Sequence, residues 1–303
     1  MKVWELFETY DPIKKIIIGD DYKNYDKTEI ADALSRVFKS DEYNQLLEHC
    51  ILVSSKRQLD QGTLAMELKG ERFSYDISVT GNVRTHNYES PLSNRAQVGD
   101  PNPDLYKRYI DSINVILAKI NKVSTSPSIH IKKPQNITSL SEIDLFNLTA
   151  SATFEGQSLT SLEGMPKKLS GSLQVHNNKR TLSFKDCPEK IGNRLSITSS
   201  KITDLEYFPK NVKEIYFYDI PNLIDLSEIT KKLISCERIS LSAEIDSGLV
   251  GLLKIKKLKE VKCYHSNDNV KKVVDIINKY LNSGRNINKC ISELEDAGLE
   301  EYI

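Results

Sequence analysis

The amino-acid sequence predicts an α+β N-terminal domain followed by a short leucine-rich-repeat solenoid that C-terminal helices cap. Three observations support this prediction. A short motif recurs about every 22 residues, a strand-like alternation closes each copy, and the chain ends in helical periodicity. A period of 20–29 residues with one strand per unit is typical of leucine-rich-repeat solenoids. We expect the α+β domain over 1–125, the leucine-rich-repeat solenoid over 126–265 and the helical cap over 266–303.

The repeated motif is a four-residue segment whose fourth position is always apolar. Its copies start 22, 22, 21 and 21 residues apart, at Ile137–Leu140, Leu159–Leu162, Thr181–Phe184, Ile202–Leu205 and Leu223–Leu226. In the middle three copies a proline follows the motif, and an apolar residue comes three positions later: Pro166/Leu169, Pro188/Ile191 and Pro209/Val212. One such unit cannot bury its own apolar face, so neighbouring units must stack into a continuous core.

Each unit closes with an apolar–x–apolar pair, which predicts a strand because strand side chains alternate between core and solvent. The pairs expected to point inward are Leu173/Val175, Leu195/Ile197, Ile215/Phe217, Ile239/Leu241 and Val261/Cys263. Their neighbours then form an outward face of Gln174, His176, Ser196, Thr198, Tyr216, Tyr218, Ser240, Ser242, Lys262 and Tyr264. This face is small, polar and aromatic, and it lacks the carboxylate or His/Cys cluster expected of a catalytic or metal site.

From this face we select candidate protein-binding residues: Gln174, His176, Tyr216, Tyr218, Lys262 and Tyr264. Exposed tyrosine is a favoured interface anchor because it is large, stiff and half polar. The alternative is that Tyr216 and Tyr218 merely cover the next repeat. The sequence indicates no catalytic residue, no metal ligand and no cofactor.

Composition excludes several classes of protein. The 303 residues include 42 basic and 42 acidic side chains, so no global field draws the chain to nucleic acid or membrane. No apolar run approaches the ~18–20 residues that span a bilayer, and Met1–Glu8 lacks the apolar core of a signal peptide. The five cysteines are odd in number and form no CxxC, which favours reduced, mostly buried thiols in a cytosolic setting.

The N-terminal residues combine helical and strand patterns. Asp26–Glu29 is a capping box that begins a helix through Phe38, and a second short helix follows Asp41. Alternating segments at 51–53, 64–68 and 73–79, separated by glycine-containing turns, predict an antiparallel meander. A helix begins at Asn102-Pro103, with Leu105, Tyr109, Ile110, Ile113, Leu117 and Ile120 on its apolar face. The polar segment Ser124–Ser128 is the expected domain boundary.

An enzymatic N-terminal domain with the solenoid as its targeting arm is one alternative. No GxSxG, P-loop, HExxH or GxGxxG motif occurs. The acid–base pairing worth checking is Asp76 beside His86 on its hairpin partner, for which a cross-strand salt bridge is the simpler interpretation. The acidic segment that starts at Asp20 has Tyr25 and Ala31 where an EF-hand needs Gly and Glu, so we interpret it as a solvated turn.

A lysine-rich run lies near the end of the solenoid: Lys254, Lys256, Lys257, Lys259, Lys262, Lys271 and Lys272. Such a run could contact phosphates or an acidic protein. Only Tyr264 supplies the aromatic interleaving of a single-strand binder, so a solvated face is favoured over nucleic-acid binding, which would require an affinity that falls steeply with salt.

The last residues predict two amphipathic helices. The first carries Val270, Val273, Val274, Ile277 and Leu281, and Gly284 is placed to end it. The second carries Ile287, Cys290, Ile291 and Leu294 and ends at Gly298. We expect both helices to cover the exposed core of the last repeat.

The unit from Leu159 to Asn178, LTSLEGMPKKLSGSLQVHNN, resembles the repeat of leucine-rich-repeat proteins of large tailed bacteriophages, which reads approximately LTSLEGxPxxVGGxFxxxNN. The ending Cys290–Tyr302 and the opening Met1–Glu8 are also similar to segments of that group. The likeness covers 137–303 and hardly touches the N-terminal domain. It implies a phage origin and a non-catalytic role, and it carries no site residues.

We therefore expect a non-catalytic protein–protein interaction protein, a structural or accessory component attached to a phage virion. The alternative is a soluble phage protein that binds and inhibits a host factor. The expected partner is a virion or host protein, the expected location is the virion or the host cytoplasm, and no membrane partner is expected. The sequence does not determine the oligomeric state.

Overall fold

The computed structural model describes residues 50–52, 63–68, 73–78, 82–87, parts of 107–118, 127–131, 137–220, 225–242, 247–264 and 267–303. The helices expected after Asp26 and Asp41, the acidic segment at Asp20, the start of the helix at Asn102 and the motif residue Leu223 lie outside these residues. The chain divides into two compact units, Met1–Gln135 and Asn136–Ile303, each of which is described by itself.

The first unit contains the expected antiparallel meander. Strands β1 (Cys50–Leu52), β2 (Thr63–Leu68), β3 (Phe73–Ser78) and β4 (Asn82–Asn87) pair antiparallel in chain order. Strand β5 (Ser128–Ile131) then pairs parallel to β4. A parallel pair needs a long crossover, and this one contains helical residues of segment 107–118 whose isoleucines and leucine are buried: Ile110, Ile113, Ile116 and Leu117.

The strand register corrects one expectation in this unit. Asp76 lies opposite Arg84, and His86 lies opposite Ser74. The predicted Asp76–His86 pairing is therefore a diagonal one across the strands, and the directly opposed residue is a cation.

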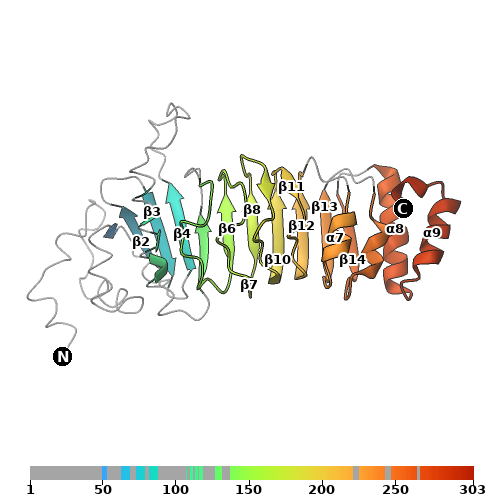
Figure 1. Cartoon of the computed structure of the whole chain (residues 1–303), viewed down its shortest axis with the longest axis horizontal. Helices are drawn as coiled ribbons and strands as arrows, with labels where there is room; N and C mark the ends of the chain where they lie inside the picture. The colour runs from blue at the N-terminus through green and yellow to red at the C-terminus, as the bar shows by residue number, and fades with distance from the viewer. Residues whose placement is uncertain are drawn as a thin grey trace, which may run out of the picture. The chain divides into compact units, whose positions relative to one another are not determined.

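The second unit is a β-solenoid in which each turn contributes one strand to a parallel sheet (Figure 1). Each turn of the solenoid is called a rung below. Its strands are β6 (Ala152–Glu155), β8 (Leu173–His176), β10 (Lys190–Thr198), β12 (Asn211–Tyr218), β13 (Arg238–Ser242) and β14 (Glu260–Cys263), paired in this order. Successive aligned residues are 21, 22, 20, 24 and 22 positions apart. The predicted repeat solenoid is confirmed.

Apolar side chains of these strands fill the interior, as their alternation predicts. The inward residues from Leu173 through Val261 keep at most 2% of their surface, whereas Cys263 in the last strand is half-buried. The apolar residues after the prolines, Leu169, Ile191 and Val212, are also buried, the first of them in the short strand β7 (Lys168–Leu169). At the middle of the stack, the ring centroid of Phe208 lies 5.3 Å from that of Phe184 and 6.1 Å from that of Phe217.

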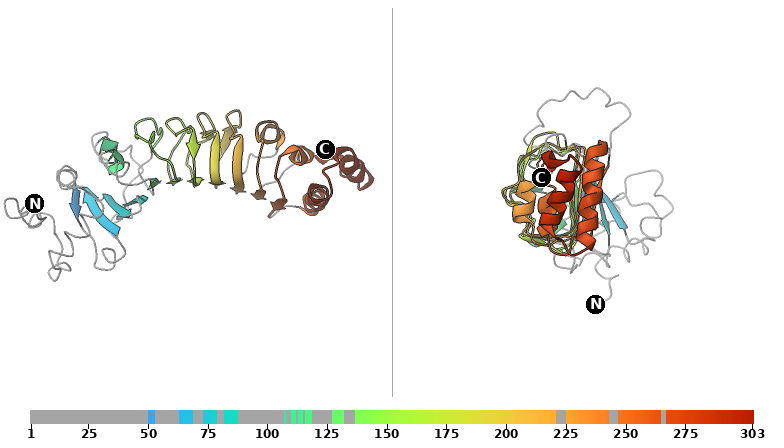
Figure 2. Two further views of the ribbon diagram at one scale, coloured as in Figure 1. Left: turned by 90° about the horizontal axis from the view of Figure 1, so that it is seen from below. Right: turned by 90° about the vertical axis from the view of Figure 1, so that its right-hand side faces the viewer.

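The opposite side of each rung is built from the repeated motif. Strands β9 (Leu182–Ser183) and β11 (Ile202–Asp204) form a small parallel sheet there. In later rungs α7 (Ser227–Lys232) and the 3-10 helix η2 (Val250–Lys254) occupy this side, and they bury Ile229, Leu252 and Leu253 (Figure 2).

Two motif residues depart from the expected pattern. Thr181 is exposed and Leu182 is buried in its place, because the corner between Asn178 and Leu182 is two residues longer than the corresponding corners of neighbouring rungs. Leu205 is only half-buried. In the same rung, Phe208 is buried and packs against Phe184 and Phe217.

Each of the first four strands of the solenoid ends at a corner residue with positive φ. These residues are Gly156 (69°), Asn177 (52°), Ser199 (46°) and Asp219 (54°). Each donates its backbone N–H to the carbonyl at the end of the next strand, at 2.8, 2.9, 2.9 and 3.1 Å. The corners therefore continue the ladder of the sheet where the chain leaves it, although only one of the four is glycine.

Two helices cover the last rung, as predicted. α8 (Asp268–Asn282) buries its expected apolar face, and α9 (Ile287–Asp296) buries Cys290 and Leu294. Gly284 and Gly298 follow the helices with φ of 99° and 68°. The view along the stack shows both helices across its end (Figure 2). The short 3-10 helix η3 (Glu300–Tyr302) ends the described chain.

Candidate protein-binding face on the parallel sheet

The strand register places the candidate residues in two rows on the outward face of the sheet. The first row runs Thr153, Gln174, Ser196, Tyr216, Ser240 and Lys262. The second runs Glu155, His176, Thr198, Tyr218 and Ser242, and Tyr264 follows one residue after β14. All six candidate residues therefore lie on one face, over rungs that are about 4.8 Å apart.

Tyr216 and Tyr218 form a stacked pair near the middle of this face. Their ring centroids are 6.3 Å apart and their planes differ by 2°. Tyr218 is 38% exposed and Tyr216 is half-buried, whereas the inward neighbours Ile215 and Phe217 keep 1% or less. The predicted outward orientation of the tyrosines is confirmed.

Small hydroxyl residues flank the tyrosine pair on both sides. Ser196, Ser240 and Ser242 keep only 5%, 7% and 9% of their surface exposed. Each is paired in register with a larger tyrosine of the same row. The tyrosines thus cover their neighbours and also present aromatic surface to solvent. The geometry therefore agrees with both interpretations of the pair, as a docking surface and as a cover for the neighbouring rungs.

The remaining candidates lie at the two ends of the rows. Gln174 and His176 are half-buried on β8, and Ser196 Oγ lies 3.4 Å from Nε2 of His176. Partial burial lowers the pKa of His176, against the opposing effect of Glu155 on β6. Lys262 is exposed and forms an ion pair of 3.1 Å with Glu260, and Tyr264 is 42% exposed.

A third row, which the sequence interpretation missed, consists of alternating charges. Arg194, Glu214, Arg238 and Glu260 lie in register at the same height of four successive strands. Their ion pairs measure 3.0 Å (Arg194–Glu214), 3.1 Å (Arg238–Glu214) and 2.9 Å (Arg238–Glu260). Hydrogen bonds from Lys262 and Arg238 lower the pKa of Glu260. Each of these four residues lies two positions before the first-row residue of its strand, so the same alternation, continued toward the start of each strand, predicts this row.

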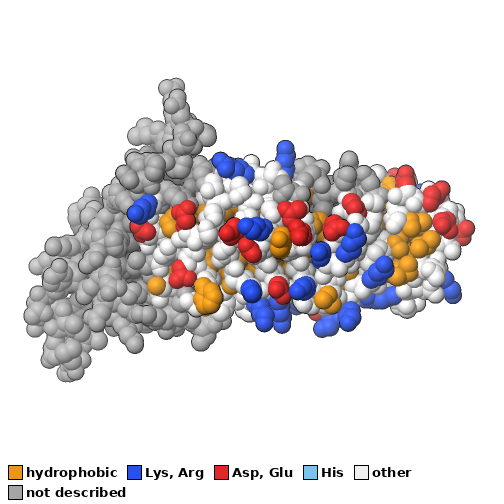
Figure 3. Space-filling view, viewed as in Figure 1, with side chains coloured by type: hydrophobic (Ala, Val, Ile, Leu, Met, Phe, Trp, Pro, Cys, Tyr) orange, Lys and Arg blue, Asp and Glu red, His pale blue; other side chains and the backbone are white. Residues whose placement is uncertain are grey.

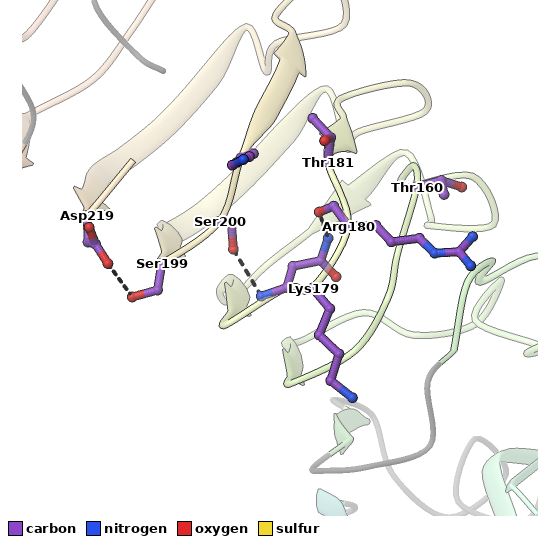
Figure 4. A pocket seen from close by; sticks show the side chains of 9 residues that line it. Thr160, Lys179, Arg180, Thr181, Ser199, Ser200 and Asp219 are labelled. Carbon is purple, nitrogen blue, oxygen red and sulfur yellow. Dashed lines mark hydrogen bonds between the residues drawn. The ribbon is translucent and has the colours of Figure 1, made fainter. Parts of the chain in front are cut away.

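The long corner after β8 creates a depression of about 590 Å³. It is lined by Thr160, Asn178, Lys179, Arg180, Thr181, Ser199, Ser200, Lys201 and Asp219. Ser199 donates to Asp219 at 2.9 Å, while the side chains of Lys179 and Arg180 extend in different directions away from that pair (Figure 4). Because these cations do not converge, the depression is not organised as an anion site.

Reactive groups are scarce in the described part of the chain. No group of three or more His, Cys, Asp and Glu side chains there could hold a metal ion. The cysteines described, Cys187, Cys236, Cys263 and Cys290, are all free. Burial raises the pKa of Cys236 to about 12 and those of Cys263 and Cys290 to about 11, which keeps these thiols protonated at neutral pH. None of the helices described has the length and apolarity to cross a membrane.

Comparison of the chain with protein families, with curated proteins and with solved structures finds no match.

Proposed function

We propose that the solenoid is a leucine-rich-repeat protein-binding module and that its partner docks on the outward rows around Tyr216 and Tyr218. The observation that carries this proposal is the stacked, outward-facing tyrosine pair in the middle of the face, with the small residues Ser196, Thr198, Ser240 and Ser242 on either side of it. Central aromatic anchors surrounded by residues of low individual contribution are the usual energetic pattern of protein interfaces.

The leucine-rich-repeat class is supported by the best-preserved unit. Leu173, Val175 and Asn178 match the L-x-L-x-x-N portion of the consensus for this class, and Asn178 is buried at the corner after the strand. The preceding residues would then form an α+β domain that adds a second contact.

We further propose that the protein is a non-catalytic accessory component attached to a bacteriophage virion. This proposal rests on the similarity of the unit Leu159–Asn178 and of the C-terminal ending to repeat proteins of large tailed phages. A soluble protein that inhibits a host factor would use the same face, so the identity of the captured partner distinguishes the two functions.

A photo-crosslinking amino acid at position 218 tests the face directly. During phage infection, irradiation should link the protein to one partner, which mass spectrometry identifies. Capture of a virion protein would support the accessory role. Capture of a bacterial protein would instead support inhibition of a host factor. Tyr207 is the matched control, because it is 47% exposed but belongs to a turn outside the sheet. Equal crosslinking from positions 207 and 218 would refute docking on the sheet.

The double substitution Tyr216→Ala and Tyr218→Ala measures the energetic role of the pair. We expect partner affinity to fall by at least ~2 kcal/mol, while the thermal midpoint stays close to that of the native chain. Leu195→Ala, a change in the core, should instead destabilise the fold by about 2–5 kcal/mol. A tyrosine double variant as unstable as Leu195→Ala would show that the pair mainly covers the neighbouring rungs.

A further inference from the structure

Lysines from several rungs gather along one edge of the solenoid, at the beginnings of its strands. Lys168, Lys190 and Asn211 are aligned by strand pairing, and isolated bridges continue this row through Ser235 to Lys256. The row contains three lysines and no acidic residue. We call it the lysine edge, and Figure 3 shows basic side chains along the corresponding lower margin of the molecule.

A neighbouring row adds further positive charge. Backbone hydrogen bonds connect Lys167, Glu189, Lys210 and Ile234 in succession from rung to rung, and Ile234 then accepts from Lys256, the last lysine of the first row. Exposed Lys213, Lys254 and Lys257 lie close by in the chain. Glu189 pairs with Lys210 at 3.3 Å, whereas within the described residues Lys167, Lys168, Lys190, Lys213, Lys254, Lys256 and Lys257 form no ion pair.

An aromatic side chain lies at the start of the same edge. Phe146 is 83% exposed, which makes it the most exposed large apolar residue of the described chain. It comes three residues before Thr149, whose carbonyl accepts a hydrogen bond from the N–H of Ser170 at 2.7 Å. Lys167 likewise precedes Ser170 by three residues, so by this count Phe146 corresponds to Lys167 in the preceding rung.

The composition of the lysine edge differs from that of a protein interface. Lysine is depleted at such interfaces, and their anchors cluster near the centre. Here the two large exposed apolar residues, Phe146 and Ile234, are four rungs apart, or about 19 Å at the spacing of strands. An acidic polypeptide would therefore find charge but no central anchor.

We propose that the lysine edge binds single-stranded nucleic acid, with lysines on the phosphates and a base stacked on Phe146. Phosphates need only point charges, and an exposed aromatic ring stacks on any unpaired base. The row from Phe146 and Asn147 to Lys256 extends over about 24 Å, the length of about seven nucleotides at the 3.4 Å rise of a stacked strand. We expect binding to depend little on base sequence, because lysines contact phosphates and an aromatic ring stacks on any unpaired base.

The sequence alone favoured a solvated face for the lysine-rich run near the C-terminus. The strand register extends the basic surface beyond that run, because it brings Lys168 and Lys190 into line with Lys256, and our proposal adds Phe146 to it. These residues are up to 110 positions apart in the chain.

Fluorescence anisotropy with labelled oligo(dT) of about 20 nucleotides tests the proposal on the full chain. The triple variant K168Q/K190Q/K256Q should lose affinity on the order of a hundredfold at 50 mM salt, and its log–log salt slope should fall by roughly 2. The control K201Q/K272Q/K289Q removes three exposed lysines elsewhere and should bind like the native chain.

Two further titrations identify the occupant. Phe146→Ala should weaken oligo(dT) binding about tenfold and leave affinity for a duplex of equal length unchanged, because duplex bases cannot stack on the ring. Poly-glutamate of matched charge should bind at least tenfold more weakly than oligo(dT). Equal binding of poly-glutamate, equal losses in both triple variants, or no oligo(dT) binding at 50 mM salt would each overturn the proposal.

Discussion

At the scale of single residues, the repeated motif encodes turns as well as core contacts. Its third position is Ser or Asp in every copy, and in four copies this side chain accepts the backbone N–H two residues later. These bonds measure 3.2 Å (Ser139), 3.3 Å (Ser161), 3.0 Å (Ser183) and 2.8 Å (Asp225). Short polar side chains stabilise turns in this way, so the recurring Ser and Asp are explained by local geometry.

Asn178 performs a similar function inside the stack. Its Oδ1 accepts from the N–H of Leu159 at 2.8 Å, and its Nδ2 donates to the carbonyls of Leu159 (2.8 Å) and Arg180 (2.7 Å). Gln157 is the corresponding residue one rung earlier, where it accepts from the N–H of Ile137. A buried amide thus satisfies the backbone of the preceding rung at each of these corners.

Asn178→Ala should therefore destabilise the solenoid by about 3 kcal/mol, since it leaves the buried N–H and carbonyl of Leu159 without their partner and removes the bond to the Arg180 carbonyl. Asn177→Gly, at the adjacent exposed corner with φ of 52°, should change stability by less than about 1 kcal/mol. Urea unfolding followed by circular dichroism measures both. Similar losses in the two variants would mean that the buried amide is not what holds the corner.

At the scale of elements, the last strand of the sheet is closed by a side chain. Asn278 of α8 accepts from the N–H of Val261 and donates to its carbonyl, both at 2.8 Å, as a further strand would. Arg285, in the turn after α8, donates to the carbonyls of Ile255 and Leu258. An open sheet edge is a template for pairing with other chains, and Asn278 occupies the outward backbone groups of Val261 at this edge.

Asn278→Ala should consequently promote self-association through β14. We expect sedimentation velocity at micromolar protein to show more concentration-dependent association than the native chain shows, with a loss of about 2 kcal/mol in unfolding free energy. Asn282→Ala is the matched control, because Asn282 lies one turn later on the same helix and bonds only to the carbonyl of Asn278. Association that is equal in both variants would locate the contact elsewhere.

The elements also explain how far the sequence could predict this protein. Strands β8, β10, β12, β13 and β14 and the buried face of α8 follow directly from apolar periodicity. The exposure of Thr181 does not follow from periodicity. The corner after Asn178 contains two additional residues, and no change in the apolar pattern before Leu182 indicates them. The lysine edge was also missed, since its residues lie 21 to 24 positions apart and come side by side only through the strand register.

At the scale of the whole solenoid, stability depends on how closely neighbouring rungs approach. A Cβ atom at Gly192 would lie 2.1 Å from the carbonyl oxygen of Ser170, and one at Gly171 would lie 2.2 Å from Ser151 Oγ. Glycine is required at these positions by contact between rungs, not by backbone angle. Because each rung contacts only its neighbours, a defect at one contact divides the stack into two parts.

Gly192→Ala should therefore separate the unfolding of the two parts. The rungs after residue 192 keep their helical cap, so we expect them to remain protected while earlier rungs open at lower urea concentration. Hydrogen exchange read by mass spectrometry distinguishes the parts, with protection lost before Gly192 and retained through β12 to β14. Gly284→Ala is the control, since its Cβ would meet nothing within 4 Å and only its positive φ is strained. It should lower stability by about 1–2 kcal/mol and keep a single transition. A single transition in Gly192→Ala as well would mean that coupling between rungs does not depend on this contact.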